Sequence, residues 1–346
     1  MTNDLDAFMA TMVAHSSPVP LAQAIELARS RYGLAAEATR LTGERDENFK
    51  LTTREGTEYV LKIANPAEST AVTDLQVAAL LHLERADAAI PCPRVVRALN
   101  GAAQVAFEDA AGVARSARVL TYLPGRLLAE SVRSSQQRRA CGHLGGRMTR
   151  ALATFEHLAS GRAVIWDVRH AGYLARLLEQ MPRFTYRPEV SEVLARLVPV
   201  IAARLPGMRR QVVHNDLNSR NVLVDPGDES RAIGIIDFGD LTRTALIADV
   251  GVAGAEMIPP YCTDPREARE CVRDVARAYH EAVPLLAPEL RILPGLVSAR
   301  LLMNVVVHEW HVHHNPSSGH FAALDPGHMS AQIRLAERLP SEEITL

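Results

Sequence analysis

Two polar clusters in the second half of the chain each adjoin a short run of strand-forming residues. Residues 214–225 read HNDLNSRNVLVD, and residues 235–240 read IIDFGD. The turn-forming segment PGDES lies between the two apolar runs, so we expect a hairpin with strands at about 221–225 and 232–237. Antiparallel pairing would bring Asn221, at the start of one strand, beside Asp237, at the end of the other. The chain must then present several polar side chains at one edge of a small sheet.

These residues also match the order His, any residue, Asp, Leu, three residues, Asn, followed later by Asp-Phe-Gly, which is the catalytic-loop pattern of kinases. Phosphoryl transfer needs Mg²⁺ held by oxygen ligands and a carboxylate that accepts the proton of the attacking hydroxyl. We predict Asp216 as this base, and Asn221 and Asp237 as ligands of Mg²⁺. The alternative is that they only cap a loop and border strands. The number of identities matched in order favours the catalytic interpretation.

Lysine is rare in this chain, because only Lys50 and Lys62 occur among 38 basic residues. A kinase site needs a cation for the phosphates that are not transferred, normally a lysine on a strand of the smaller lobe. Lys62 in the strand-like GTEYVLKIAN fits this need, and Val60 and Ala64 on the same strand face would lie against a purine. The alternative is a lysine that extends from a strand edge into solvent. We interpret Lys50 as an exposed strand residue.

Upstream, LTGERDENFKL at 41–51 contains one glycine and no G-x-G-x-x-G, so the phosphate loop of protein kinases is absent. The segment 43–49 is predicted as a hairpin turn over the nucleotide, with Asn48 or backbone amides touching phosphate. An ordinary loop is the alternative. No activation segment of the usual kind follows Asp237, which disfavours a protein substrate.

The 346 residues can bury two cores, so a two-lobed enzyme is expected. A helix at about 18–32, strands within 38–64 and a helix at about 70–84 are predicted first. Short strands in PCPRVVRAL, AAQVAFED and SARVLTYL complete this lobe, and a mainly helical region follows from about 127, interrupted only by the hairpin. TYLPG at 121–125 is the expected hinge. The predicted fold class is α+β, with lobes at 1–122 and 123–346.

Composition excludes several other classes. The net charge is −2 and 23% of the residues are charged, so neither nucleic acid nor an anionic membrane is an expected partner. The first residues lack the basic and apolar regions of a signal peptide, and no window approaches twenty uninterrupted apolar residues. We therefore expect a cytoplasmic protein. Its four cysteines form no C-x-x-C pair, so we expect neither disulfides nor structural zinc.

With these motifs together, the chain from about 38 to 335 resembles the aminoglycoside phosphotransferase and choline kinase-like family. The strings GERDENF, YVLKIAN, FEH, IWDVRHA and HNDLNSRNVLV look most like the hydroxylysine kinase branch. The resemblance implies a protein-kinase-like two-lobed fold and transfer of the γ-phosphoryl group of ATP or GTP to an amino alcohol. The implied acceptor is 5-hydroxylysine. An aminoglycoside, choline, ethanolamine or homoserine is the alternative acceptor, and a pseudokinase that binds nucleotide without turnover is the alternative from another class.

The resemblance also implies roles for single residues. It assigns Asp216, Asn221, Asp237 and Lys62 the roles given above and makes 120–122, including Thr121 and Tyr122, the hinge whose backbone meets the nucleotide base. Asp249 matches an aspartate that supports the catalytic loop, with a helix N-cap as the alternative. There are two departures. Gln76, with Asp74 nearby, stands where many relatives have the glutamate that pairs with the strand lysine, and Asn215 replaces a common glycine.

The acceptor pocket is less well defined by sequence. HEWHVHHNP at 308–316 contains four histidines, but it is not H-E-x-x-H, so a helix end lining the pocket is favoured over a metal site. An acceptor ammonium would meet an acidic or aromatic side chain, and its carboxylate a cation. The candidates are Asp240, Glu256, Glu309, Trp310 and Arg243, and for each the alternative is an ordinary surface or packing role.

Overall fold

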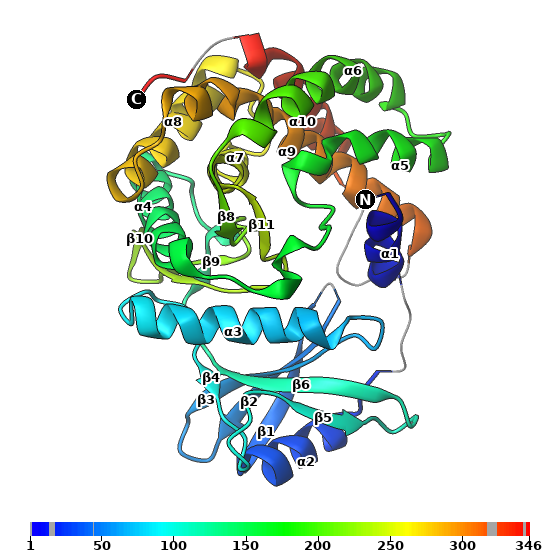
Figure 1. Cartoon of the computed structure of the whole chain (residues 1–346), viewed down its shortest axis with the longest axis vertical. Helices are drawn as coiled ribbons and strands as arrows, with labels where there is room; N and C mark the ends of the chain where they lie inside the picture. The colour runs from blue at the N-terminus through cyan, green and yellow to red at the C-terminus, as the bar shows by residue number, and fades with distance from the viewer. Residues whose placement is uncertain (1, 14–17, 44, 317–323, 342–343) are drawn as a thin grey trace.

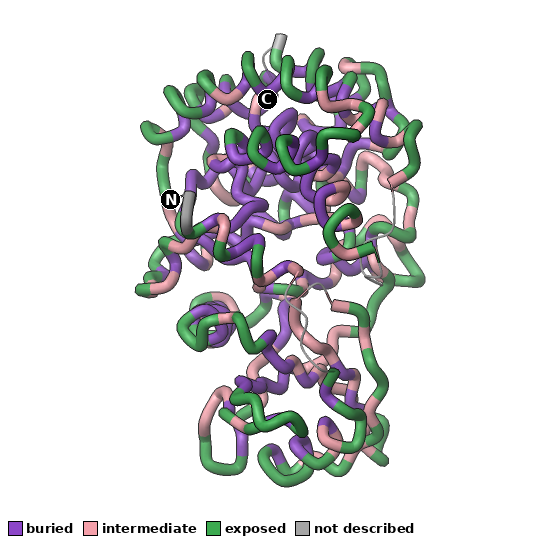
Figure 2. The backbone as a smooth tube through the Cα atoms, turned by 90° about the vertical axis from the view of Figure 1, so that its right-hand side faces the viewer, coloured by how far each residue is buried: buried purple, intermediate pink, exposed green. Residues whose placement is uncertain are grey.

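The structure, a computed structural model, describes residues 2–13, 18–43, 45–316, 324–341 and 344–346. Figure 1 shows two lobes, with a sheet-rich N-lobe (residues 18–122) below and a larger helical C-lobe above. Figure 2 shows that buried backbone is concentrated inside each lobe and that the connection between them is thin. The expected α+β, two-lobed architecture is confirmed.

The N-lobe is an antiparallel sheet of six strands in the order β1-β2-β3-β6-β4, with β5 paired to β6. The strands are β1 (Ala36–Leu41), β2 (Glu47–Thr53), β3 (Glu58–Ile63), β4 (Val95–Val96), β5 (Val105–Glu108) and β6 (Ala114–Thr121). Helix α2 (Leu21–Tyr32) packs on this sheet and ends at Gly33, whose φ of 69° is left-handed, as is usual for a helix C-cap. Both N-lobe helices begin close to the predicted positions.

Strand alternation decides which N-lobe side chains face the C-lobe. Phe49, Leu61 and Ile63 are fully buried in the core beneath α2. Because successive side chains of a strand point to opposite faces, Asn48 and Lys62 point to the other face of the sheet. Helix α3 (Thr70–Ala86) lies between the sheet and the C-lobe (Figure 1), where its apolar residues join a core cluster with helix α4.

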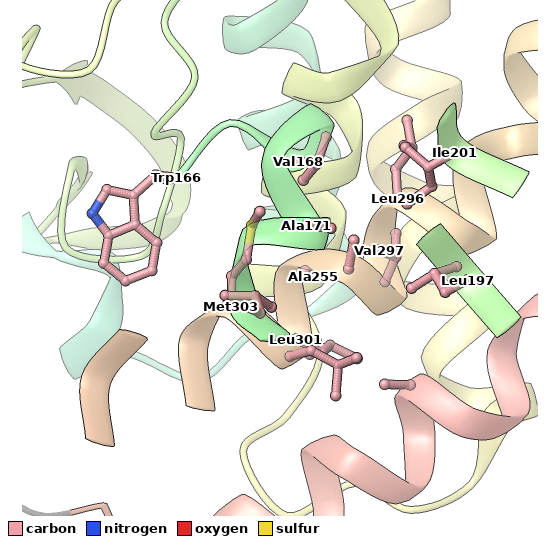
Figure 3. Close-up of a cluster of buried hydrophobic side chains, with 14 of the residues drawn as sticks. Trp166, Val168, Ala171, Leu197, Ile201, Ala255, Leu296, Val297, Leu301 and Met303 are labelled. Carbon is pink, nitrogen blue, oxygen red and sulfur yellow. The ribbon is translucent and has the colours of Figure 1, made fainter. Parts of the chain in front are cut away.

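The C-lobe is built around one long helix, α9, which packs against the lobe's other helices. Its helices are α4 (Ser135–Ala151), α5 (Leu174–Gln180), α6 (Arg187–Arg204), α7 (Leu246–Glu256), α8 (Pro265–Ala282), α9 (Ala287–His314) and α10 (Pro326–Arg338). By length and composition α9 is able to cross a membrane, but 78% of its most apolar window is buried inside the protein. Figure 3 shows Leu296 and Val297 of α9 facing Leu197 and Ile201 of α6. Burial in this core explains the apolar composition of α9.

Two small sheets hold the catalytic segments of the C-lobe. The predicted hairpin is present as β9 (Val222–Asp225) and β10 (Asp228–Ile235), with β7 (Arg126–Leu127) on the far side of β9. The expectation that only this hairpin interrupts the helical region was wrong, because a second pair of strands is present. In it, β8 (Arg210–Val213) pairs with β11 (Thr242–Ala245). These four-residue strands are joined by no local turn, so periodicity did not reveal them. The segment between β8 and β9 is the predicted catalytic loop, and the Asp-Phe-Gly segment lies between β10 and β11.

The first helix, α1 (Thr2–Val13), departs from the expected division at residue 122. It precedes the N-lobe in sequence but packs on the C-lobe, beside α9 (Figure 1). Leu5, Phe8, Met9 and Met12 are buried in the C-lobe core. Burial of four apolar side chains stabilises this placement by several kcal/mol, at about 1.5–3 kcal/mol for each fully buried large side chain. The start of the chain is therefore part of the C-lobe.

Candidate active site

Helix α7 holds the predicted catalytic loop, residues 214–221, in place. The backbone N–H of Asn215 donates to Asp249 Oδ1 at 2.7 Å, and both residues are buried. Asn215 has a φ of 65°, a left-handed conformation that glycine and asparagine adopt most readily. This explains how asparagine replaces glycine there. The His214 ring meets the Phe238 ring edge-on at 4.9 Å, which ties the loop to the Asp-Phe-Gly segment. Asp249 supports the loop.

Three side chains hold the carboxylate of Asp216. Asn218 donates to Oδ1 at 2.8 Å and Arg300 donates to the same oxygen at 2.9 Å. Asn221 donates to Oδ2 at 2.6 Å. Burial raises the pKa of Asp216 to about 7, while the charge of Arg300 acts in the opposite direction. A fixed carboxylate with a pKa near neutrality suits a general base.

Asn221 and Asp237 are brought together by the hairpin, as the sequence predicted. The N–H of Ile236 donates to the Asn221 carbonyl at 2.8 Å, so Asp237 follows directly beside Asn221. Asp237 has a φ of 59°, an uncommon backbone conformation that occurs often at functional sites. The charge of Lys62, whose Nζ lies 3.4 Å from Oδ1, lowers the pKa of Asp237 against the effect of burial. Asp237 is therefore ionised.

The donor set fits Mg²⁺, which prefers oxygen ligands. Asp237 offers a carboxylate, and the amide nitrogen of Asn221 faces Asp216, so its amide oxygen faces the other way. These two residues are therefore the ones that would hold the metal. Among the residues described, no group of three or more His, Cys, Asp or Glu side chains is arranged to bind an ion, and this includes the described part of the histidine-rich segment at 308–316.

Lys62 is oriented by aspartates rather than by Gln76. Its Nζ lies 3.9 Å from Asp46 Oδ2 as well as 3.4 Å from Asp237 Oδ1. Gln76 instead accepts a hydrogen bond from Arg118, which stands opposite Lys62 in the pairing of β3 with β6. Arg118 also lies 2.8 Å from Asp46. Burial opposes ionisation of Asp46, but Arg118 and Lys62 together lower its pKa. Asp46 thus replaces the missing glutamate as a partner of Lys62.

The expected phosphate-loop residue Asn48 lies beside Lys62 in the β2–β3 pairing. Its amide nitrogen donates to the Thr42 carbonyl at 3.5 Å, so here it holds the loop rather than facing outward. A side chain on Gly43 would begin 2.3 Å from the Asp46 carbonyl oxygen. The turn therefore needs its single glycine because the backbone folds back on itself.

The backbone N–H groups of the hinge residues Thr121 and Tyr122 already donate hydrogen bonds to other N-lobe residues. The N–H of Thr121 donates to the Arg94 carbonyl at 2.9 Å, and the N–H of Tyr122 donates to the Glu58 carbonyl at 3.2 Å. A nucleotide base at this position would therefore meet carbonyl oxygens of these residues, not their amides. Lys50 is half-buried, paired with Glu58 at 2.6 Å and placed 4.4 Å over the Tyr122 ring. The expectation that Lys50 is simply exposed was wrong, because its ammonium group pairs with Glu58 and lies over that ring.

Two cavities meet at Asp216, which among the residues that the structure describes is the only one that lines both. The smaller, about 30 Å³, is lined by Lys62, Asn48 and Asp237 among others and corresponds to the metal and phosphate site. The larger, about 360 Å³, lies within the C-lobe and is lined by segments that include 216–220 and the α9 residues Arg300 and Asn304. The base has to lie within reach of the acceptor hydroxyl where that hydroxyl meets the phosphoryl donor, so the larger cavity is the candidate acceptor pocket.

One of the predicted acceptor residues, Glu256, lines this pocket. Its Oε1 accepts from Asn304 Nδ2 at 2.9 Å, and its Oε2 accepts from Ser219 Oγ at 3.5 Å. On the other side of Ser219, Arg133 donates to the same Oγ at 3.3 Å. A carboxylate and a guanidinium thus lie on two sides of one hydroxyl within the pocket.

The other acceptor candidates lie elsewhere. Asp240 lines the smaller cavity, and Arg243 is exposed and lies 3.4 Å from Glu156. Trp310 is buried and donates to Gln180 Oε1 at 2.7 Å, so its ring is not available to a substrate. Glu309 is absent from the lining, while His308 is part of it. The prediction that the end of this helix lines the pocket holds for His308.

Sequence reasoning missed Arg300 and Arg133. Arg300 is buried in α9, stacks 4.8 Å from the centre of the Trp166 ring and lies 3.8 Å from Glu256. The available signal was a lone arginine in the apolar run PGLVSARLLMNVVV, since a buried charge normally has a specific partner. Arg133 lies in a polar segment, SVRSSQQRR, where nothing distinguishes it from its neighbours.

Comparison with known sequences agrees with this geometry. The model of the phosphotransferase enzyme family matches residues 37–293. Hydroxylysine kinase of Mus musculus is 27% identical over 309 residues, which cover 83% of this chain and 81% of that protein. Hydroxylysine kinase of Danio rerio is 25% identical over 314 residues, or 87% of each chain.

Solved structures show the same fold at low identity. An amicoumacin kinase in complex with AMP-PNP, Ca²⁺ and Ami has a TM-score of 0.68 and 17% identity, and the match covers 98% of this chain and 96% of that one. A microcompartment-associated aminopropanol kinase has a TM-score of 0.63 and 18% identity, covering 91% and 94%. Because the family model matches well over half of the sequence, the chain belongs to the phosphotransferase enzyme family and is a small-molecule phosphotransferase.

Proposed function

We propose that this enzyme transfers the γ-phosphoryl group of ATP or GTP to the hydroxyl of 5-hydroxylysine or of a closely related amino acid. The observation that carries this proposal is the pair formed by Glu256 and Arg133 on two sides of Ser219. An amino acid has an ammonium and a carboxylate on one carbon, so a cation and an anion one hydroxyl apart match it. The relatives named hydroxylysine kinase support the same acceptor.

Each catalytic group has one task in this proposal. Asp216 accepts the proton of the acceptor hydroxyl, and Asn218 and Arg300 hold its carboxylate in place. Lys62 binds the phosphates that remain with the nucleotide. Asn221 and Asp237 would hold Mg²⁺, which when bound neutralises charge on the phosphates. The C-lobe pocket orients the acceptor and excludes water from the hydroxyl that reacts.

We expect hydroxylysine to be phosphorylated with a kcat/KM at least about 100-fold above that of choline or ethanolamine, because both lack the carboxylate that would pair with the charge of Arg133. Phosphate transfer from radiolabelled nucleotide to hydroxylysine, homoserine, choline, ethanolamine and a kanamycin-type aminoglycoside measures this. A higher kcat/KM for choline or for the aminoglycoside would refute the hydroxylysine assignment and leave the phosphotransferase chemistry intact.

The substitution Glu256→Gln should raise the KM for hydroxylysine by about 10- to 100-fold, since a hydrogen bond to a charged group contributes about 1.5–3 kcal/mol. The KM for nucleotide should not change, because Glu256 does not line the phosphate cavity. Glu309→Gln is the matched control, since Glu309 follows the pocket residue His308 in the chain but does not itself line the pocket. An unchanged KM for hydroxylysine in Glu256→Gln would rule out this carboxylate as the ammonium partner.

A further inference from the structure

Arg45, which lies two residues before β2, reaches across the cleft to the C-lobe. Its Nη2 lies 2.6 Å from Asp240 Oδ1, and its Nη1 lies 3.6 Å from Glu68 Oε2. The side chain is only 10% exposed. Its guanidinium carbon lies 5.0 Å from the centre of the Phe8 ring of α1, so the C-lobe holds Arg45 from a second direction.

The guanidinium of Arg45 lies next to the metal-binding carboxylate. A side chain on Gly239 would begin 3.1 Å from Arg45 Nη2 and 3.0 Å from Asp237 Oδ1, so these two atoms flank the same glycine. Arg45 and Asp237 also line the small cavity, together with Lys62 and Asp216. Arg45 thus lines the same small cavity as the predicted metal carboxylate and the predicted base.

A second arginine converges on the same acid from the C-lobe. Arg162 Nη2 lies 3.6 Å from Asp240 Oδ1 and donates to the Gly239 carbonyl, and its Nη1 lies 3.8 Å from Glu68. Burial and then the charge of Arg45 lower the pKa of Arg162. Two buried cations this close to each other favour an anion between them. Asp240 and Glu68 both supply one in the present arrangement.

The small cavity is narrow in the present arrangement. Its volume is about 30 Å³, against about 360 Å³ for the acceptor pocket. A phosphoryl group that enters it must therefore come into contact with the side chains that line it. Arg45 is one of them, and its partner Asp240 is an anion that phosphate oxygens can replace.

We propose that Arg45 is a catalytic residue that exchanges Asp240 for the transferred phosphoryl group when nucleotide binds. The bond between the γ-phosphorus and its bridging oxygen breaks while a bond to the acceptor oxygen forms. The acceptor proton passes to Asp216, and the nucleoside diphosphate leaves. Arg45 donates hydrogen bonds to the equatorial oxygens, whose charge is dispersed during transfer. Arg162 stays paired with Asp240 and keeps that carboxylate away from the phosphate.

The inference rests on the phosphotransferase chemistry, and it does not depend on which acceptor is used. Its test is therefore a binding measurement that needs no acceptor. Calorimetry would compare Mg·ADP and Mg·GDP with and without aluminium fluoride, which imitates the phosphoryl group in flight. In Arg45→Gln we expect the affinity gained from aluminium fluoride to fall at least about 100-fold, the range seen when one transition-state donor is removed. The affinity for Mg·ADP or Mg·GDP alone should stay within about threefold.

Turnover provides the second readout, measured with whichever acceptor the parent enzyme phosphorylates. Arg45→Gln should lower kcat by at least about 100-fold, and Arg45→Lys should restore part of it, because lysine keeps the charge but not the planar pair of donors. Arg54→Gln, on the exposed turn between β2 and β3, should match the parent. An aluminium fluoride gain that is unchanged in Arg45→Gln would overturn the proposal, as would an equal loss of affinity with and without fluoride. Failure to phosphorylate hydroxylysine would overturn the proposed acceptor only.

Discussion

Asp216→Asn should lower kcat by about 10²-fold or more while leaving nucleotide affinity nearly unchanged. An amide has the shape of the carboxylate but cannot accept the proton of the acceptor hydroxyl. Asp216 lines the smaller cavity, which holds the predicted phosphate site, only where that cavity meets the acceptor pocket. Binding of the nucleotide should therefore persist. Steady-state kinetics and calorimetry on the same preparation would measure both quantities.

The structure supplies a matched control for this variant. Asp274 of α8 lies 2.8 Å from Arg138, with 19% of its side chain exposed, and Asp216 lies 2.9 Å from Arg300, with 18% exposed. Asp274→Asn therefore breaks a comparable aspartate–arginine pair that lines neither cavity. We expect its kcat to equal that of the parent. A near-normal kcat in Asp216→Asn would exclude Asp216 as the base, whereas equal losses in both variants would indicate a general effect on folding.

Asp237→Ala should abolish the dependence of nucleotide binding on Mg²⁺ and lower kcat by at least about 100-fold. The substitution removes the carboxylate that would hold the metal beside the phosphates. Asp237 is also the nearer of the two aspartates that face Lys62, so the lysine loses part of its orientation. Calorimetry with and without Mg²⁺ separates the effect on the metal from the effect on Lys62, because only the first depends on Mg²⁺.

Asp228→Ala is the control for this second variant, since Asp228 begins the same strand β10 but is exposed at the hairpin turn. It should keep the full enhancement by Mg²⁺. If Asp237→Ala showed the same enhancement as Asp228→Ala, Asp237 would not be a metal ligand. If instead both lost it, the hairpin as a whole would be disturbed, which thermal unfolding would reveal as a lower Tm.

Much of the site was predictable because its parts are local in sequence. Asp216 and Asn221 share one loop, and a hairpin of a few residues brings Asp237 beside them. Antiparallel pairing over such a short connection brings the start of one strand beside the end of the other, so the spacing was sufficient. The place of Lys62 followed in the same way, because alternation along β3 turns it away from the buried Leu61 and Ile63.

Other expectations failed where a pairing or a contact had no local signal. Strands β8 and β11 are only four residues long, too short for a period to be recognised. Gln76 lacked the charge expected of a partner for Lys62, and the sequence did not indicate that Asp46 would take that place. Arg118 determines this arrangement, because it donates a hydrogen bond to Gln76 and pairs with Asp46.

The sequence by itself thus determined the reaction type and predicted a set of site residues that the fold brings together, since short-range backbone geometry relates those residues to one another. Only the tertiary structure decided what surrounds them. Arg300 is 84 residues from Asp216 in the chain, and Arg45 is 195 residues from Asp240. Such contacts form only when α9 is buried in the C-lobe and the two lobes close on each other, because packing of whole elements, not local periodicity, sets their distance. The acceptor pocket and the position of Arg45 are therefore properties of the folded chain alone.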